Sequence, residues 1–396
     1  MSYLEKLLKD ISVEWKPLGE VIKLEKGKQL NKELLSENGL YPAYNGGTSF
    51  SGYADIYNYN ENTIIISQGG ASAGFVNFVT TKFYANAHCY VVLPKIETVE
   101  NRFIYHFLKL NQEKLMNKQH GAGIPALRTN EILGIQTPVP PLKIQQKIVD
   151  ILDKFTELTT ELTTELTTEL IARKQQYNYY REQLFAFDEN EIQHLPMGDE
   201  SIGEFQRGKR FVKTDLLTEG VPTIHYGEMY THYGTWADTT KSFVSEELVK
   251  NKNLRVAHKG DVVIVAAGET IEDIGKGTAW LGDEGVVIHD ACFSYKTTLN
   301  PKFVAYFTRT KQFHDQIKKH ISSGKISAIN SKGLSKAIIP IPSSEEQERI
   351  VSILDKFDIL TNSISEGLPK EIQLRQKQYE YYRDLLLTFP KDNVEA

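Results

Sequence analysis

The chain has 396 residues, is 40% hydrophobic and 24% charged, and carries a formal net charge of -5, which favours two or three folded domains over one. No apolar run reaches the roughly 18 residues of a membrane span, and the N-terminal segment lacks a signal-peptide pattern, so we expect a cytoplasmic protein with no membrane partner. The two cysteines, Cys89 and Cys292, are too few for a disulfide framework or a zinc site and are predicted to be buried thiols.

Residues 1–137, called arm 1, are predicted to form a small α+β domain. The apolar run Thr63–Ile66 is typical of a core strand, and residues Phe103–Met116 are typical of a helix. Arm 1 holds 14 basic and 13 acidic residues. It is therefore not a basic block, and contact with a polyanion would have to come from local loops.

Residues 138–187 are predicted to form one long helix. Pro138, Pro140 and Pro141 mark its start, because proline is tolerated only before or within the first helical turn. Apolar residues then follow at alternating spacings of four and three, which is the seam of a coiled coil. The tract of TTEL repeats at residues 156–170 could be disordered as low-complexity sequence, but its leucines continue the seam, so we favour a helix.

Residues 188–339, called arm 2, resemble arm 1 in outline and are also predicted to be an α+β domain. Asp261–Val265 is typical of a core strand and Phe303–His320 of a helix. Cys292 corresponds to Cys89, and Arg207-Gly208-Lys209 corresponds to Lys26-Gly27-Lys28. With 19 basic and 20 acidic residues, arm 2 is not a basic block either.

Residues 340–396 contain a second copy of the helical segment. Aligned without gaps, residues 138–187 and 340–389 are identical at 22 of 50 positions, which establishes an internal duplication. Gly367 and Pro369 predict a kink or break in the second copy. We expect the two copies to pair as an antiparallel coiled coil through their apolar seams, giving a pseudo-twofold molecule. The predicted pairing residues are Ile148, Phe155, Leu158, Leu162, Leu166, Leu170, Ile350, Phe357, Leu360 and Ile364.

With this plan, the chain resembles the specificity subunits of type I restriction-modification enzymes over its whole length. The resemblance rests on the segments Ile148-Val149, Ile151-Leu152-Asp153 and Arg173–Arg181, and on their counterparts Ile350-Val351, Ile353-Leu354-Asp355 and Arg375–Arg383. Tandem four-residue repeats between the two recognition domains, here TTEL, mark one branch of that family.

The resemblance implies that the arms are two target recognition domains, each reading half of a split, asymmetric target in double-stranded DNA. The helices would act as a ruler and dock two methyltransferase subunits, and restriction/translocase subunits would join the complex. It also implies no cofactor in this chain, with S-adenosylmethionine, ATP and Mg²⁺ held by partner subunits. Neither the target sequence nor the exact spacer length follows from the chain alone.

Basic and amide side chains beside glycines are the candidates for DNA contact, because Arg and Lys pair with guanine or phosphate while Asn and Gln pair with adenine. In arm 1 they are Lys26, Lys28, Gln29, Tyr44, Asn45, Gln68, Lys118, Gln119, His120 and Arg128. In arm 2 they are Arg207, Lys209, Arg210, Lys213, His225, Tyr226, Lys318, Lys319, His320, Lys325, Ser327 and Asn330.

The motifs of catalysis are not found in the sequence. Gly203–Arg210 resembles a nucleotide-binding loop but has Arg where the Mg²⁺-binding Ser or Thr is required. The histidines have no metal-ligand spacing, and His88 or His289 fits a hydrogen-bonding role at a strand end better. A non-catalytic specificity subunit is the favoured interpretation, and the alternatives are a coiled-coil adaptor protein and a solitary DNA-modifying enzyme.

Overall fold

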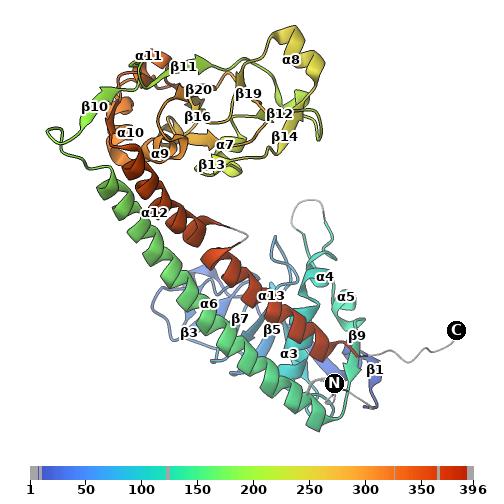
Figure 1. Ribbon diagram of the computed structural model, residues 1–396. Coiled ribbons are helices and arrows are strands. Elements are labelled where there is room, and N and C mark those ends of the chain that lie inside the picture. The colour runs from blue at the N-terminus through green and yellow to red at the C-terminus, as the bar shows by residue number, and fades with distance from the viewer. Residues whose placement is uncertain (1–7, 9–10, 122–124, 325, 364–365, 390–396) are drawn as a thin grey trace. The chain divides into compact units, whose positions relative to one another are not determined.

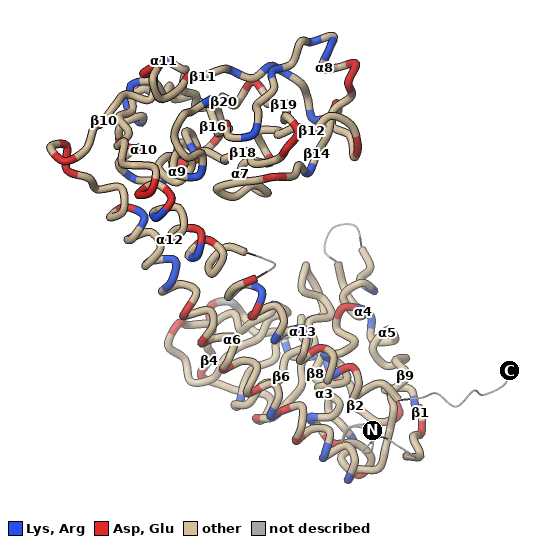
Figure 2. The backbone as a smooth tube through the Cα atoms, in the orientation of Figure 1, with Lys and Arg blue, Asp and Glu red and all other residues tan. Residues whose placement is uncertain are grey.

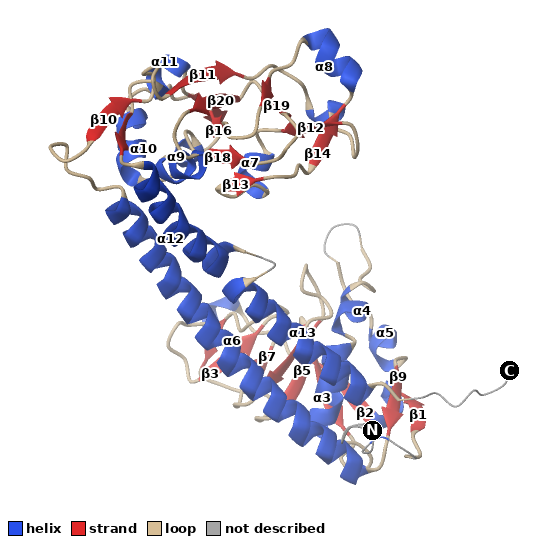
Figure 3. Cartoon of the chain, viewed as in Figure 1, coloured by secondary structure: helices blue, strands red, loops and turns tan. Residues whose placement is uncertain are grey.

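The structure, a computed structural model, describes the chain apart from residues 1–7, 9–10, 122–124, 325, 364–365 and 390–396. The chain forms two compact units, which are residues 1–165 with 372–396 (unit 1) and residues 166–371 (unit 2). Each unit joins an arm of short strands and helices to segments of long helix (Figures 1 and 3). The predicted α+β class is therefore confirmed for both arms.

Arm 1 in unit 1 contains three sheets, with strand orders β1-β9, β2-β8-β5-β6 and β4-β3-β7. Its strands are β1 (Glu14–Pro17), β2 (Ile22–Lys26), β3 (Tyr41–Tyr44), β4 (Gly52–Ala54), β5 (Thr63–Ser67), β6 (Val76–Val79), β7 (Tyr84–Ala85), β8 (Cys89–Pro94) and β9 (Gln136–Val139). Its helices are α2 (Leu18–Val21), the 3-10 helix η1 (Lys32–Leu34), α3 (Asn101–Leu110), α4 (Gln112–Met116) and α5 (Thr129–Leu133).

Arm 2 in unit 2 repeats this topology with additions, in the sheets β10-β22, β11-β20-β16-β18-β13, β14-β12-β19-β15 and β17-β21. Its strands are β10 (Gln193–Pro196), β11 (Gly203–Arg207), β12 (Val221–Ile224), β13 (Trp236–Ala237), β14 (Ser242–Val244), β15 (Val256–Ala257), β16 (Val262–Val265), β17 (Ala267–Gly268), β18 (Gly277–Trp280), β19 (Val286–Ile288), β20 (Cys292–Thr297), β21 (Ser327–Ala328) and β22 (Ile338–Ile341). Its helices are η2 (Lys213–Asp215), α7 (Glu228–Thr231), α8 (Glu246–Lys252), η3 (Ile271–Asp273), α9 (Pro301–Phe307), α10 (Lys311–Lys318) and α11 (Ser331–Leu334).

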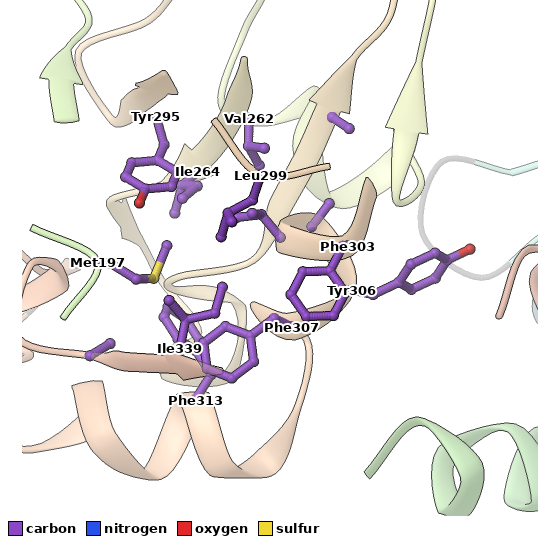
Figure 4. Close-up of a cluster of buried hydrophobic side chains, with 14 of the residues drawn as sticks. Met197, Val262, Ile264, Tyr295, Leu299, Phe303, Tyr306, Phe307, Phe313 and Ile339 are labelled. Atoms are coloured by element: carbon purple, nitrogen blue, oxygen red, sulfur yellow. The ribbon is translucent and has the colours of Figure 1, made fainter. Parts of the chain in front are cut away.

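The central strand of each arm is buried on both faces, as its unbroken apolar sequence requires. In β5, Ile64 and Ile66 join the core beneath α3, while Ile65 joins a second core on the other face. In β16, Val262 and Ile264 point into the core shown in Figure 4, together with Phe303, Phe307 and Phe313 from α9 and α10. The period of two along a strand thus supplies two cores from one run of residues.

Two predicted helices are each divided in the structure. Phe103–Met116 lies in α3 and α4, which meet at Asn111, and Phe303–His320 lies largely in α9 and α10. The second division occurs because the Thr310 side chain accepts a hydrogen bond from the amide of Phe313 and so starts a new helix. The prediction of one helix in each place was wrong.

The first repeated segment is a continuous helix, α6 (Leu142–Leu184). Its TTEL tract is helical, as predicted, and the threonine hydroxyls are bonded within the helix. The hydroxyl groups of Thr163 and Thr164 donate to the carbonyls of Thr159 and Thr160, each at 2.7 Å, so they bond within the helix instead of competing with it.

The second repeated segment is broken, as Gly367 and Pro369 predicted. It consists of α12 (Ser344–Asn362) and α13 (Gly367–Leu387), and Gly367 has a φ of +73°. In unit 1, α13 runs antiparallel to the first part of α6, with Tyr382 against Phe155 and Tyr379 bonded to Thr156 at 3.1 Å. In unit 2, α12 runs antiparallel to the last part of α6, with Phe357 against Tyr177 and Tyr180. The predicted antiparallel pairing is present in each unit.

The predicted pairing residues differ in burial. Ile148 and Ile350 are fully buried, and Leu158 is 47% exposed. Phe155, Leu162, Leu166, Leu170, Phe357 and Leu360 are half-buried, and Ile364 lies outside the described residues.

The same polar contacts attach each arm to its helix. In unit 1, Asp153 of α6 accepts hydrogen bonds from Arg102 Nε at 3.1 Å and from His106 Nε2 at 2.7 Å. In unit 2, Asp355 of α12 accepts from Lys302 Nζ at 2.8 Å and from Tyr306 Oη at 2.7 Å. The aspartates occupy equivalent positions of the duplication, so the attachment is duplicated although the donors differ.

Candidate nucleic-acid interface

The two K/R-G-K loops follow β2 in arm 1 and β11 in arm 2 and approach a neighbouring chain segment closely. A Cβ atom on Gly27 would lie 2.2 Å from the Asn86 carbonyl oxygen, and one on Gly208 would lie 2.1 Å from the His289 carbonyl oxygen. Both contacts are too short for any side chain, so glycine is required there. The basic residues on either side of each glycine are thereby held beside the strand end.

One side chain in each arm holds this loop from the opposite segment. Asn86 Nδ2 donates to the Leu30 carbonyl at 3.4 Å, and Asn86 Oδ1 accepts from the amide of Ala87 at 2.6 Å. His289 does both in arm 2, with Nε2 on the Phe211 carbonyl at 2.9 Å and Nδ1 accepting from the amide of Ala291 at 3.1 Å. We call Asn86 and His289 the loop braces.

The backbone around each brace joins further loops in the same way. Asn86 and His289 donate their amides to the carbonyls of Tyr44 and Ile224, which end β3 and β12. The carbonyls of His88 and Ala291 accept from the amides of Gln68 and Ala266. Those two residues accept in turn from the amides of Leu127 and Ile329, at 2.8 Å in both arms. Loops far apart in sequence, which carry most of the predicted residues, thus meet at one end of each arm.

In arm 2 these loops enclose a cleft of about 440 Å³. Five of the predicted residues line it, namely Arg207, Arg210, Lys213, His225 and Tyr226. The prediction did not include the other residues of the cleft that carry polar or large side chains, which are Phe211, Glu269, His289, Asp290 and Ile326. Because Cys89 corresponds to Cys292, Asn86 corresponds to His289. This alignment could have identified His289, directly after β19, as a residue of the cleft.

The cleft is amphoteric, with three basic residues and two acidic ones among its described lining residues. Arg207 Nε donates to the Asp290 carbonyl at 3.0 Å, which fixes the guanidinium at the rim. Burial lowers the pKa of both His225 and His289 and so favours their neutral forms. Both ring nitrogens of His289 bond within the arm, whereas His225 bonds through Nδ1, which accepts from the amide of Gly227 at 3.3 Å. Figure 2 shows that basic and acidic positions are interspersed along the backbone of each unit.

In arm 1 the predicted residues divide into exposed and internally bonded ones. Lys26, Lys28, Asn45 and Arg128 are exposed. Lys118 and His120 face Glu131 at 3.1 and 3.6 Å. Tyr44 is half-buried against Phe50 and Phe83. The side-chain amides of Gln29 and Gln119 donate to the carbonyls of Leu30 and Ala73, respectively. The Oε1 atom of Gln68 is buried without a hydrogen-bond partner among the described residues.

The other predicted residues of arm 2 lie outside the cleft lining. Lys209 Nζ lies 3.4 Å from the Lys252 carbonyl, and Asn330 accepts from the amide of Gly333 and caps α11. Lys318 and Lys319 are exposed at the end of α10, His320 has a buried Nε2 without a described partner, and Ser327 is buried in β21. Lys325 lies outside the described residues.

The remaining motifs have structural roles. Cys89 and Cys292 are buried free thiols, as predicted, and burial raises their pKa values to about 11 and about 12. The nucleotide-loop resemblance at Gly203–Arg210 is excluded, because Gly203–Arg207 is strand β11. Among the residues that the structure describes, no group of three or more acidic, His or Cys side chains could hold a metal ion, and no helix could span a membrane.

The sequence profile of the type I restriction modification DNA specificity domain matches residues 12–172 and 200–374. The chain belongs to this family. As a specificity subunit it is the non-catalytic component of its system. It is 36% identical over 98% of its length to a putative type I restriction enzyme specificity subunit of Haemophilus influenzae, of which 98% is covered. It is 33% identical over 99% of its length to the EcoR124I/EcoR124II specificity subunit of Escherichia coli, of which 98% is covered.

Solved structures of specificity subunits share the fold. The subunit from M. genitalium is 20% identical, with a TM-score of 0.51 and coverage of 99% of this chain and 100% of that one. A chain from a study of complex assembly and conformational transition of the type I restriction-modification system is 17% identical, with a TM-score of 0.66 and coverage of 96% and 98%.

Proposed function

We propose that residues 1–137 and 188–339 are target recognition domains that each read one half of a bipartite, asymmetric target in double-stranded DNA. Residues 138–187 and 340–396 space the two domains and dock two methyltransferase subunits, and restriction/translocase subunits complete a cytoplasmic complex. S-adenosylmethionine, ATP and Mg²⁺ belong to those partners in this proposal.

One observation carries the proposal: both arms bring equivalent loops together with the same backbone hydrogen bonds, but present different side chains there. Asn45 and His225 follow equivalent strand ends, Gln68 is replaced by Ala266, and His120 by Ser322. A shared framework places loops against the same DNA backbone geometry, whereas the donors and acceptors that change are what distinguishes base pairs. This pattern fits two readers of different sequences.

The arm 2 cleft supplies the chemistry for such reading. Arg207 and Arg210 can bond guanine edges or phosphates, and His225 and Tyr226 offer neutral donors and acceptors. The acidic side chains of Glu269 and Asp290 reject phosphate at part of the rim and can accept a hydrogen bond from cytosine. The cleft therefore suits base contact more than general attraction to DNA.

An exchange of arms tests the division of labour. Replacing residues 1–137 with the corresponding segment of another specificity subunit should change one half of the methylated target only. The readout is the sequence around methylated adenines in a host that also carries the methyltransferase subunit. A change in both halves would contradict separate recognition domains.

The isolated chain is expected to bind DNA weakly at physiological salt. Its net charge of -5 offers little phosphate neutralisation, and non-specific affinity at such salt is about 10⁻⁴ to 10⁻⁶ M even for typical DNA-binding proteins. We expect tight specific binding only after methyltransferase subunits are added, as measured by fluorescence anisotropy on a target duplex. Tight binding by the chain alone would contradict this role for the partners, and methylation by the chain alone would favour the solitary enzyme.

The loop brace His289 gives a residue-level test. His289→Asn should retain DNA affinity in the assembled complex, because Asn86 in arm 1 likewise donates to the facing loop, at the Leu30 carbonyl, and accepts from an amide of its own segment, that of Ala87. His289→Ala removes both hydrogen bonds and should weaken binding about tenfold, since a lost buried hydrogen bond costs about 1–2 kcal/mol. Equal affinities for the two variants in an anisotropy titration would show that the brace does not position the loop.

A further inference from the structure

A second cleft in unit 2 is formed by α6, α12 and the segment from α7 to β13 (labelled in Figure 1). Tyr230 separates it from the first cleft, since its hydroxyl donates to the carbonyl of Ala267, a residue of the first lining, at 2.9 Å. The second cleft has a volume of about 710 Å³ and shares no described lining residue with the first cleft. Four aromatic side chains, two arginines and one aspartate dominate it. They are Tyr177, Tyr230, Tyr233, Trp236, Arg181, Arg309 and Asp358.

The two arginines are incompletely bonded. Arg309 Nη2 donates to the carbonyls of Gly234 and Gly277 at 2.8 and 3.0 Å, yet its Nε is buried with no hydrogen-bond partner among the described residues. Arg181 Nε is likewise buried and unpartnered, and its ion-pair contact with Glu182 is long, at 3.6 Å. Buried donors without acceptors are rare because each costs free energy.

The electrostatics of the cleft favour an anionic group as its occupant. Burial lowers the pKa of Arg309. The charges of Tyr177 and Asp358 raise this pKa, and the charge of Arg181 lowers it further. Arginine does not lose its proton in proteins, so the two cations remain beside each other. Of the charged residues described in the lining, Asp358 alone is acidic, and the cleft therefore keeps a net positive charge.

The pair of cations recurs in unit 1, but there each cation has an acceptor of its own: Lys109 Nζ donates to Gln112 Oε1 at 2.8 Å, and Arg383 donates to Asp384 Oδ1 at 2.9 and 2.8 Å. By the duplication, Tyr379 and Arg383 of α13 correspond to Tyr177 and Arg181, and Lys109 corresponds to Arg309. Lys109 Nζ lies 3.3 Å from the Val76 carbonyl, which is the counterpart of the Gly277 carbonyl. Burial, and then the charge of Arg383, lowers the pKa of Lys109. A pair of neighbouring cations is thus kept in both units although the rest of the arms has diverged.

We propose that the Arg181–Arg309 cleft binds an acidic side chain of a docked methyltransferase subunit, together with the aromatic or aliphatic residues beside that side chain. Arg383 and Lys109 bind the equivalent acidic side chain of a second methyltransferase subunit. The inference rests on the proposed function and adds the chemistry of the docking contact. Two sites related by the duplication match two identical partners.

The surroundings favour a protein over DNA phosphate as the occupant. Ile359 lines the cleft and is 47% exposed, and Tyr180 beside it is 40% exposed. The lining is also rich in tyrosine, tryptophan and arginine, and aromatic residues and arginine are enriched in protein interfaces. A phosphate chain would bring several negative charges past Asp358 and Glu182, whereas an acidic side chain brings one.

The test uses the chain co-expressed with its methyltransferase subunits, with native mass spectrometry as the readout. Arg181→Glu should weaken one of two docking events by at least about tenfold, so that complexes with one methyltransferase subunit accumulate. Asp358→Asn, which removes the only described acid of the lining, should shift the balance towards complexes with two. Arg383→Glu should repeat the loss in unit 1, and the double variant should lose both subunits.

Lys356→Glu is the matched control, because Lys356 is an exposed residue of α12, roughly 200° around the helix from Asp358. It makes the same charge change outside the cleft and should leave the stoichiometry unchanged. Far-ultraviolet circular dichroism checks that each variant folds.

Two results would overturn the inference. In the first, Arg181→Glu keeps two methyltransferase subunits and loses affinity for DNA, which would make the cleft a phosphate site. In the second, Arg181→Glu behaves like Lys356→Glu, which would show that the cations play no part in assembly. A wild-type chain that binds no methyltransferase subunit would instead refute the proposed function itself.

Discussion

Replacing Asp355 by alanine is expected to lower the free energy of unfolding of unit 2 by about 2–3 kcal/mol, because it leaves the buried Tyr306 hydroxyl and the partly buried Lys302 ammonium without their acceptor. Its carboxylate accepts from Lys302 and Tyr306, and Tyr306 is fully buried. Neither donor has another acceptor among the described hydrogen bonds. The variant should also loosen the contact between α9 and α12, although the buried Ile350 and Leu354 still pack in the same core as Phe303.

The equivalent change in unit 1, Asp153→Ala, should cost less, about 1–2 kcal/mol, because its side chain is 38% exposed and water can replace part of the lost contact. Burial by itself would raise the pKa of Asp153, but hydrogen bonds from Arg102 and His106 outweigh it and hold the pKa below the usual value. This carboxylate therefore stabilises unit 1 above the pKa of the unfolded state, and the contribution is lost as pH falls through the folded pKa.

Urea unfolding followed by circular dichroism measures both changes. Glu348→Ala is the control, since Glu348 is an exposed residue on the same helix as Asp355 and should change the free energy by less than about 0.5 kcal/mol. If Asp355→Ala were no more harmful than Glu348→Ala, the contact would not hold the arm to the helix. Tyr306→Phe combined with Asp355→Ala should be less than additive, because both remove the same hydrogen bond.

The features that the sequence predicted well are those with a local cause. Prolines at residues 138–141 and 340–342 lie just before α6 and α12. Gly367 and Pro369 predict the break between α12 and α13, and the four-three spacing of apolar residues predicts which helix faces pair. The continuous apolar runs at residues 63–66 and 261–265 similarly predict strands buried on both faces. Each depends on residues within one or two turns of one another.

The contacts that position the arms were not predicted, because they join residues distant in sequence. Asp153 and Asp355 stood in the quoted motifs, but nothing local indicates that Arg102 with His106, or Lys302 with Tyr306, would face them. The loop braces show the same limit, because the residue itself could be predicted but its hydrogen-bond partner could not. A strand-end hydrogen-bonding role was predicted for His289 and is confirmed, whereas its partner, the Phe211 carbonyl, is a backbone atom that no sequence pattern displays.

Deleting one TTEL repeat, Thr159–Leu162, is expected to shorten the unread spacer of the DNA target by one base pair and to leave both half-sites unchanged. The deletion joins Leu158 to Thr163, so the remaining sequence is still TTEL and the apolar seam continues. It removes four residues from the continuous helix α6. The helix becomes about 6 Å shorter, and everything after the deletion turns by roughly 40°.

The rotation and the translation correspond to different numbers of base pairs. A base pair contributes about 3.4 Å of rise and about 34–36° of twist, so the rotation matches one base pair while the translation is nearer to two. Facing the correct groove is the stricter demand, because an arm can tilt to absorb a few ångströms but loses its base contacts when turned away. With half-sites of about three to five base pairs, one helical turn between the arms implies a parent spacer of roughly six to eight.

The break in the second copy allows α6 to change length. The contacts of α6 with α13, at Phe155 and Thr156, and with α12, at Tyr177 and Tyr180, lie on opposite sides of the deleted repeat. Both sets can persist only if α12 and α13 move closer by the same amount. That shift has to be taken up between Asn362 and Gly367, where described residues Ser363 and Glu366 are not helical.

The spacer length and the half-sites are measured by sequencing the methylated adenines in hosts that carry the parent chain, the deletion or one control. The control replaces Thr159–Leu162 by four alanines, which keeps the length of α6 in strong helix-forming residues and should keep the parent spacer. One additional TTEL repeat should lengthen the spacer by one base pair. A spacer that stays the same after the deletion, or half-sites that change with it, would mean that α6 does not set the distance between the two readers.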